Sequence, residues 1–340
     1  MDYCIKFRLV MYLCVFAVIS VFPFSSCAEE SETSVEHEAG VYYSIQKGDT
    51  LWDLSHRFLD SPWQWPDMWS ENSQIANPHR IYPGNRIRLF QRKDVARWVD
   101  TDLDKEVVEK KDPLYYFYPS IDKIGFIKKE PVTHRGTIIE VKDDKKIISK
   151  GDLVYIRPNE DTSFIPGNKF TVYRTLKPLR ERRTNSYIGI QHYLTGIVEI
   201  TKIEPKFAVA RVVQSFRSIE VNDLLMPYVK RSPKIILTES KKELKGKIIV
   251  SEEHASIIGD NTVAFIDKGN KDGVKPGQMY TIFYQEKKRL DPKTKGDVYL
   301  TPVYFGTLIV LHTEETTSAV FLTSAEKSIY PGADIHLTEP

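Results

Sequence analysis

The first clear pattern along the chain covers residues 41–90, and its hydrophobic period changes as it proceeds. Apolar side chains first occupy every second position, which predicts a strand with one buried face: Val41, Tyr43 and Ile45. After a Gly48-Asp49 turn the apolar spacing becomes helical, at Leu51, Leu54 and Phe58. Thr50, with Asp53 three residues later, has the spacing of a capping box, so we expect a helix to begin there.

A second helix and a closing strand are predicted in the rest of this segment. Pro66 suits the first turn of a helix, where its missing N–H group has no intrahelical partner to lose. Two turn dipeptides follow, Asn77-Pro78 and Pro83-Gly84, and Ile87 and Leu89 then alternate on a strand. The expected order is therefore strand, helix, helix, strand, near the lower size limit for a domain without disulfides.

Residues 132–338 show short alternating segments separated by Gly, Pro and Asp turns, and this pattern occurs twice. The two copies are offset by 110 residues and match at these pairs: Gly136 and Gly246, Ile156 and Ile266, Gly167 and Gly277, Gly196 and Gly306. Neither copy contains a long helical stripe. The sequence therefore predicts two tandem all-β, small barrel-like repeats, at 132–230 and 240–338.

Three further segments are rich in charged residues and show no strong hydrophobic period. Residues 92–131 are charged and contain an aromatic cluster at 114–118. We expect a semi-ordered connector whose aromatic cluster packs on a neighbouring domain, the alternative being a partner-docking motif. Basic loops interrupt both repeats, at 177–186 and 287–297. They are either solvated hairpins or, because they recur at equivalent places, a docking surface.

The first 28 residues have the organisation of a secretory signal. Lys6 and Arg8 precede an apolar run, and small residues follow it. We predict cleavage after Ala28 and a periplasmic, wall-associated mature protein. A loose lipobox ending at Cys27 offers the alternative of an acylated outer-membrane lipoprotein.

Composition then excludes several classes of function. All three cysteines lie within residues 1–28, so the mature chain has no disulfide and no thiol nucleophile. Removal of that segment lowers the formal charge from +2 to +1, which does not favour nucleic acid as a partner. The eight histidines are scattered, and the chain has no His-Glu-x-x-His and no Gly-x-Ser-x-Gly motif. We therefore predict no cofactor, no metal site and no catalytic residues.

Residues 42–90 resemble a LysM domain, a small βααβ module that binds N-acetylglucosamine polymers. Two motifs carry the resemblance: Tyr43-x-Ile45-x-Lys47-Gly48-Asp49-Thr50-Leu51-Trp52, and Asn77-Pro78-x-x-Ile81-Tyr82-Pro83-Gly84-x-x-Ile87-x-Leu89. The domain is expected to span 40–91. The resemblance implies a shallow sugar groove between two loops, with these candidate contacts: Gly48, Asp49, Thr50, Leu51, Asn77, His79, Arg80 and Ile81.

The LysM pattern leaves two questions open. The side chains of Asp49 and Thr50 either contact the sugar or serve only to cap the helix that follows. The chain also departs from the pattern between the helices, where the longer segment LDSPWQWPDMW makes the flank more aromatic. We expect Trp52, Trp65 and Trp69 in the core and Trp63 exposed.

The order of the domains suggests a function for the whole chain. The tandem repeats resemble the C-terminal domain of the flagellar T-ring protein. With a signal and one LysM segment, the chain is similar to the secretin-associated, peptidoglycan-binding proteins of type IV pilus systems in Gram-negative bacteria. This implies a non-catalytic adaptor with two partners, peptidoglycan and an outer-membrane secretin. The alternative is an enzyme that acts on peptidoglycan, or a regulator of a wall hydrolase.

Overall fold

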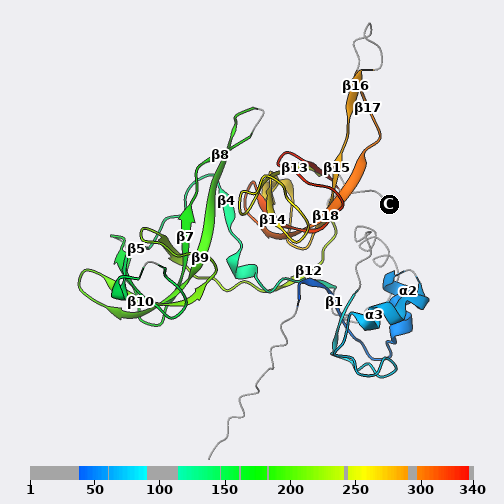
Figure 1. Cartoon of the computed structure of the whole chain (residues 1–340), viewed down its shortest axis with the longest axis horizontal. Coiled ribbons are helices and arrows are strands. Elements are labelled where there is room, and N and C mark those ends of the chain that lie inside the picture. The colour runs from blue at the N-terminus through cyan, green and yellow to red at the C-terminus, as the bar shows by residue number, and fades with distance from the viewer. Residues whose placement is uncertain are drawn as a thin grey trace, which may run out of the picture. The chain divides into compact units, whose positions relative to one another are not determined.

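A computed structural model describes residues 38–59, 61–89, 114–145, 147–160, 162–181, 184–240, 244–289 and 297–336 (Figure 1). The predicted signal at 1–28 and the charged first part of the connector lie outside these ranges. Within them, no helix is long and apolar enough to cross a membrane.

The N-terminal part of the described chain contains two short helices packed on a sheet, drawn in blue in Figure 1. Its elements are β1 (Gly40–Ser44), α2 (Leu51–Leu59), the 3-10 turn η1 (Pro62–Gln64), α3 (Trp65–Ser70) and β2 (Arg86–Arg88). β1 and β2 pair antiparallel, with Tyr43 opposite Ile87. The apolar positions that set the sequence period form the core between sheet and helices: Val41, Tyr43, Ile45, Leu51, Leu54, Phe58, Met68, Ile87 and Leu89.

The described part of the connector, residues 114–131, is more ordered than the sequence suggests. It contains β3 (Tyr115–Phe117), the 3-10 turn η3 (Ile121–Lys123) and β4 (Phe126–Lys128). β3 pairs with the free edge of β1, and β12 (Lys234–Ile236), from the segment between the repeats, pairs with β3 in turn. The resulting sheet has the order β12-β3-β1-β2. An unpaired strand edge attracts such additions because its N–H and C=O groups need partners. Residues 114–128 are therefore ordered, and the prediction of a semi-ordered connector is wrong for this part of it.

The first repeat forms a barrel, drawn in green in Figure 1. Its strands are β5 (Gly136–Val141), β6 (Leu153–Pro158), β7 (Lys169–Thr175), β9 (Tyr187–Ile203), β10 (Ala208–Ser215) and β11 (Leu224–Pro227), with the 3-10 turn η4 (Lys142–Asp144) after β5. Because β10 pairs with β6 on one side and β9 on the other, the six strands close on themselves. β4 and β8 (Leu179–Arg180) add to the outer part of β9.

The second repeat is a closed six-stranded barrel with the same neighbour order. Its strands are β13 (Lys245–Ser251), β14 (Val263–Ile266), β15 (Met279–Tyr284), β18 (Val303–Thr313), β19 (Ser318–Ala325) and β20 (Asp334–His336), with the 3-10 turn η5 (Asn270–Asp272) after β14. An isolated bridge joins Ile148 to Ile219 in the first barrel and Ile258 to Ile329 in the second, at the predicted offset. The remainder of the chain is thus largely all-β, as its alternation predicts.

One turn shows how closely the two copies correspond. Gly167 and Gly277 both have φ in the left-handed region, +87° and +88°. The N–H of Gly167 donates to the carbonyl of Ile200, and the N–H of Gly277 donates to the carbonyl of Val310, both at 2.8 Å. Glycine suits this turn because a side chain there is strained.

The two basic loops are extensions of barrel strands. In the first repeat, β8 pairs with β9 at the base of the 177–186 loop. In the second, β16 (Lys287–Arg289) and β17 (Asp297–Tyr299) pair with each other as a separate two-stranded hairpin. The described strands at the base of both loops are therefore paired as hairpins.

Polar contacts join the two repeats through the connector. The Glu252 side chain is 3% exposed, accepts the Gly125 N–H at 2.6 Å and lies 3.2 Å from the Arg217 guanidinium. Burial raises the pKa of Glu252, and the nearby Arg217 opposes that effect. Tyr118 packs against Phe321 of β19, with ring centroids 5.1 Å apart. The aromatic cluster therefore does pack on a neighbouring domain.

Candidate functional site

The loop between β1 and α2 is held by its own backbone and by Asp49. The Asp49 carboxylate accepts the Gln46 N–H at 2.7 Å, and the Asp49 N–H donates to the Gln46 carbonyl at 3.2 Å. Gly48 between them has φ +97°, and among the described residues no atom lies within 4 Å of where its Cβ would be. The turn therefore presents a stretch of backbone that another molecule can approach closely.

The side chains that follow Gly48 serve the fold. The Thr50 hydroxyl donates to the Asp53 carboxylate at 2.6 Å and accepts the Asp53 N–H at 3.1 Å, which caps α2. Leu51 is only 3% exposed and belongs to the core. This candidate sugar contact is therefore not accessible through its side chain, because Leu51 starts the buried stripe of α2. What this loop offers to a ligand is mainly backbone and shape.

The loop before β2 is ordered in a similar way and leaves its polar side chains exposed. The Asn77 side-chain oxygen accepts the His79 N–H at 2.9 Å, and the Arg80 N–H donates to the Asn77 carbonyl at 3.0 Å. His79 and Arg80 are exposed, whereas Ile81 is half-buried against the core. Asn77 thus shapes the turn, and His79 and Arg80 remain accessible for polar contacts.

Asn72 fixes this second loop to the sheet. It is fully buried, and its side-chain amide donates to the carbonyls of Met68 and Arg88, each at 2.7 Å. Its side-chain oxygen accepts the Arg88 N–H at 2.7 Å. The end of α3 is therefore joined to β2 on either side of the loop.

Tyr43 lies under the first loop and has a perturbed hydroxyl. Burial raises the pKa of Tyr43 to about 12, and the negative charge of Asp49 adds to the increase. The phenol therefore stays neutral at physiological pH.

The tryptophans divide into two groups. Trp65 and Trp69 are half-buried against the core, as expected. Trp63 is 76% exposed, also as expected, but Trp52 is 42% exposed and is not a core residue. Trp52 and Trp63 meet edge to face, with ring centroids 4.8 Å apart and planes at 78°. Sequence reasoning missed this contact because it joins a helix to the irregular insertion that follows.

Comparison with known proteins identifies the module that these loops belong to. Residues 43–90 match the LysM domain family. The chain is also similar to the uncharacterized protein YqbP of Bacillus subtilis (strain 168), with 34% identity over 59 residues, which cover 14% of this chain and 27% of that protein. The chain thus spans about a quarter of this curated relative. Residues 43–90 form a LysM domain, and such domains bind N-acetylglucosamine-containing peptidoglycan.

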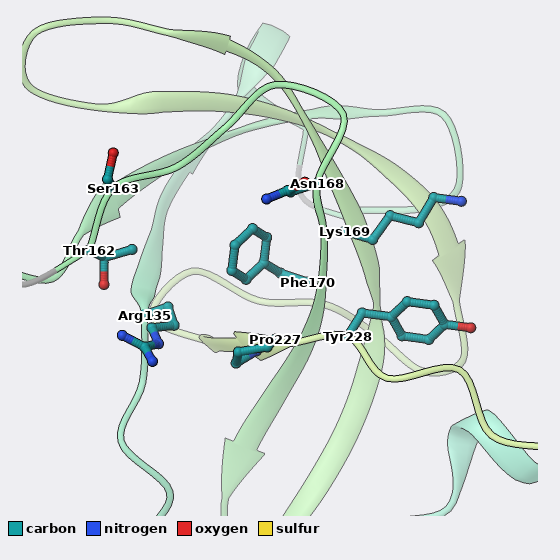
Figure 2. Close-up of a pocket in the computed structure, with 8 residues that line it drawn as sticks. All are labelled: Arg135, Thr162, Ser163, Asn168, Lys169, Phe170, Pro227 and Tyr228. Carbon is teal, nitrogen blue, oxygen red and sulfur yellow. The ribbon is translucent and has the colours of Figure 1, made fainter.

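An open pocket in the first barrel is a separate feature. Figure 2 shows the Phe170 ring in its centre, with Arg135 and Lys169 on opposite sides. The Tyr228 hydroxyl donates to Asp122 at 3.0 Å, and Lys169 lies 4.0 Å from Glu199. The two cations thus do not converge on one point. In the described part of the chain, no group of three or more His, Cys, Asp or Glu residues is arranged to hold a metal ion.

Proposed function

We propose that this chain is a non-catalytic periplasmic adaptor. Its LysM domain binds the glycan of peptidoglycan, and its tandem barrels hold an outer-membrane secretin of a type IV pilus-type machine. Wall binding rests on the LysM domain, with its open turn at Gly48 and the loop that Asn77 orders. Secretin binding rests on the order of the domains and on the resemblance of the repeats to the C-terminal domain of the flagellar T-ring protein.

The loops suggest how the glycan is bound. An N-acetyl group has one hydrogen-bond donor and one acceptor, which exposed loop backbone matches. The turn at Gly48 lets a sugar approach the main chain, and His79 and Arg80 supply polar contacts from the other loop. Asp49 and Thr50 contribute by fixing the loop, since both side chains are used inside it.

A single shallow site of this kind binds peptidoglycan weakly, so one LysM domain alone would anchor an adaptor poorly. Each hydrogen bond adds only about 0.5–1.5 kcal/mol net. Several copies around a ring-shaped secretin solve this problem. Once one LysM domain is bound, the next one binds at an effective concentration that can reach ~mM. The hairpins at 177–186 and 287–297 are the candidate contacts to an acidic face of the secretin.

Wall binding is tested by a matched pair of glycine substitutions. We expect Gly48→Val to abolish co-sedimentation of the mature chain with purified sacculi, because the side chain occupies the approach to the backbone. Gly84→Val is the control: Gly84 also has positive φ, +86°, and open space around its Cβ among the described residues, but it is not one of the candidate sugar contacts at 48–51 and 77–81. Gly84→Val should still sediment. Equal binding by Gly48→Val and the wild type rules out this groove.

The secretin contact needs substitutions, because truncation damages the LysM sheet. β12 lies beyond the first barrel and completes that sheet, so deletion of 132–338 removes one of its strands. We therefore expect Lys-to-Glu and Arg-to-Glu changes in 177–186 and 287–297 to reduce co-purification with the secretin from crosslinked envelopes, while sacculus binding persists. Unchanged co-purification excludes the hairpins, and release of soluble muropeptides from the sacculi favours a wall-acting enzyme instead.

A further inference from the structure

The insertion between the two LysM helices leaves an aromatic surface that the proposed groove does not use. Trp52 lies in the first turn of α2, and Trp63 lies in η1. We call these two side chains the Trp52–Trp63 pair. They contact each other, yet both remain substantially exposed to solvent.

The fold does not account for this exposure. The neighbouring Trp65 and Trp69 pack on the LysM core, and the Trp69 indole N–H donates to the Ile75 carbonyl at 2.7 Å. Trp63, by contrast, leaves most of a large apolar ring in water. Burying such a ring is worth a few kcal/mol, so a surface position for it costs stability that binding can recover.

The pair borders both loops of the groove. Trp52 is the second residue of α2, two residues after Thr50 of the first loop, and its ring contacts Trp63. Two residues beyond Trp63, the Trp65 ring lies 6.1 Å from the ring of His79 in the second loop. A chain of ring contacts and covalent neighbours therefore links one loop to the pair and the pair to the other loop.

We propose that the Trp52–Trp63 pair is a second glycan subsite that receives the sugar units beyond those held by the two loops. The proposal rests on the proposed function, since it presupposes that the loops bind a glycan strand. Its ligand is the apolar C–H face of a pyranose ring, which stacks on the exposed Trp63 indole.

The geometry of the pair suits this ligand. Trp52 packs edge to face against Trp63, which limits the rotation of both rings before a ligand arrives. A rigid aromatic surface binds with a small loss of side-chain entropy. A glycan strand that leaves the groove over Trp52 meets Trp63 next, so one continuous ligand covers both places.

The size of the patch argues against a membrane as its ligand. Over the described residues between 38 and 89, the strongly exposed large apolar side chains are Trp52, Trp63 and Tyr82. Single apolar residues are normal on protein surfaces, and a membrane contact needs a larger apolar face or a cluster of basic residues beside it.

The test is the dependence of affinity on glycan length. The full mature chain is titrated with N-acetylglucosamine oligomers from the disaccharide to the octasaccharide, by calorimetry and by indole fluorescence. For wild type, affinity should rise with length beyond what the groove holds. We expect Trp63→Ala to weaken the long oligomers about tenfold, the effect of losing one well-used aromatic contact, and to leave the short ones unchanged. Trp63→Phe should restore part of the loss.

Tyr82→Ala is the matched control, because Tyr82 is an exposed aromatic residue of the same domain. It should bind every oligomer like wild type. Wild-type affinity of Trp63→Ala for the long oligomers overturns the subsite, as does an equal loss at every length, which places Trp63 in the groove itself. If Trp63→Ala instead loses only secretin co-purification, the pair is a protein contact and the proposal is wrong. If wild type binds no oligomer at all, the proposed function fails first.

Discussion

Asn72 is the residue on which the geometry of the second loop depends most directly. We expect Asn72→Ala to lower the free energy of unfolding by roughly 2–4 kcal/mol, because three backbone groups lose the hydrogen bonds of this buried side chain. Chemical denaturation of the full chain measures this loss, and the loop should also bind glycan less well. Ser73→Ala, next to it and exposed, should have little effect. Similar stabilities for the two variants contradict the role assigned to Asn72.

His192 gives the first barrel a dependence on pH. Its ring is buried, stacks on Phe126 at 4.6 Å and accepts the Val132 N–H at 3.0 Å. Burial lowers the pKa of His192 from 6.5 to about 4. The unfolded state therefore binds this proton more readily, so the stability contributed by neutral His192 is present above pH 6.5 and falls as the pH drops towards 4.

The corresponding experiment compares unfolding across that pH range. Wild type should lose at most about 3 kcal/mol through this group between pH 6.5 and 4. His192→Gln should be less stable at neutral pH but show a flatter dependence on pH. His56→Gln, on the exposed face of α2, should keep the wild-type slope. An unchanged slope in His192→Gln assigns the acid sensitivity to other groups.

Single residues also show where sequence reasoning succeeds and where it does not. Thr50 was predicted as a helix cap because capping depends on residues three positions apart, and the structure has that cap. Trp52 was assigned to the core because tryptophan is usually buried there. Its actual partner, Trp63, lies on the insertion, and the packing of an irregular segment leaves no periodic signal.

At the scale of elements, the equivalent turns of the two repeats differ in what surrounds them. A Cβ at Gly277 would lie 1.9 Å from the carbonyl oxygen of Ile236 in β12, whereas at Gly167 none of the described atoms comes within 4 Å. Both positions have the same positive φ, so both alanine variants suffer about 1–2 kcal/mol of backbone strain. Gly277→Ala must in addition displace β12.

We therefore expect Gly277→Ala to destabilise the protein clearly more than Gly167→Ala. The melting temperatures of the two variants give the comparison, and hydrogen exchange at β12 and β3 shows where the extra loss occurs. Exchange should accelerate there in Gly277→Ala alone. If both variants melt alike, β12 does not rest on this turn in solution.

The elements that the sequence did not reveal are those whose pairing is non-local. Alternation and the 110-residue offset predicted two all-β repeats, because each repeat must bury one face of every strand. β3 and β12 are strands of only three residues. β3 pairs with the edge of β1, more than 70 residues away along the chain, and β12 pairs with β3. Nothing in such short segments specifies a partner. The aromatic cluster was the only hint that the connector is packed.

At the scale of the whole molecule, a buried carboxylate connects the repeats. Glu252 of the second repeat has two charge-stabilising partners, the Arg217 guanidinium of the first repeat and the Gly125 N–H of the connector. Ion pairs of this kind rarely add much net stability compared with apolar residues, but removing one partner leaves an unpaired buried charge. The contact therefore fixes how the repeats associate more than it stabilises either barrel.

Arg217→Ala should lower the free energy of unfolding by about 3–5 kcal/mol at neutral pH, because Glu252 stays buried without its cation. Burial already raises the pKa of Glu252, and this pKa rises further in Arg217→Ala. The folded state of the variant therefore binds the Glu252 proton more tightly than the unfolded state does. Stability then falls as the pH increases through that raised pKa, and the defect should shrink as the pH is lowered below it. Calorimetry at several pH values measures this.

The double variant Arg217→Ala/Glu252→Gln removes the charge that causes the penalty, and we expect it to recover much of the lost stability at neutral pH. Arg174→Ala is the matched control, since Arg174 pairs with buried Asp223 inside the first barrel. Glu252→Gln should not rescue that variant, because the two sites share no partner. If Glu252→Gln rescues both variants equally, or neither, the charge of Glu252 is not what couples the repeats. A specific rescue of Arg217→Ala instead shows that Arg217 of the first repeat compensates the buried charge of Glu252 in the second.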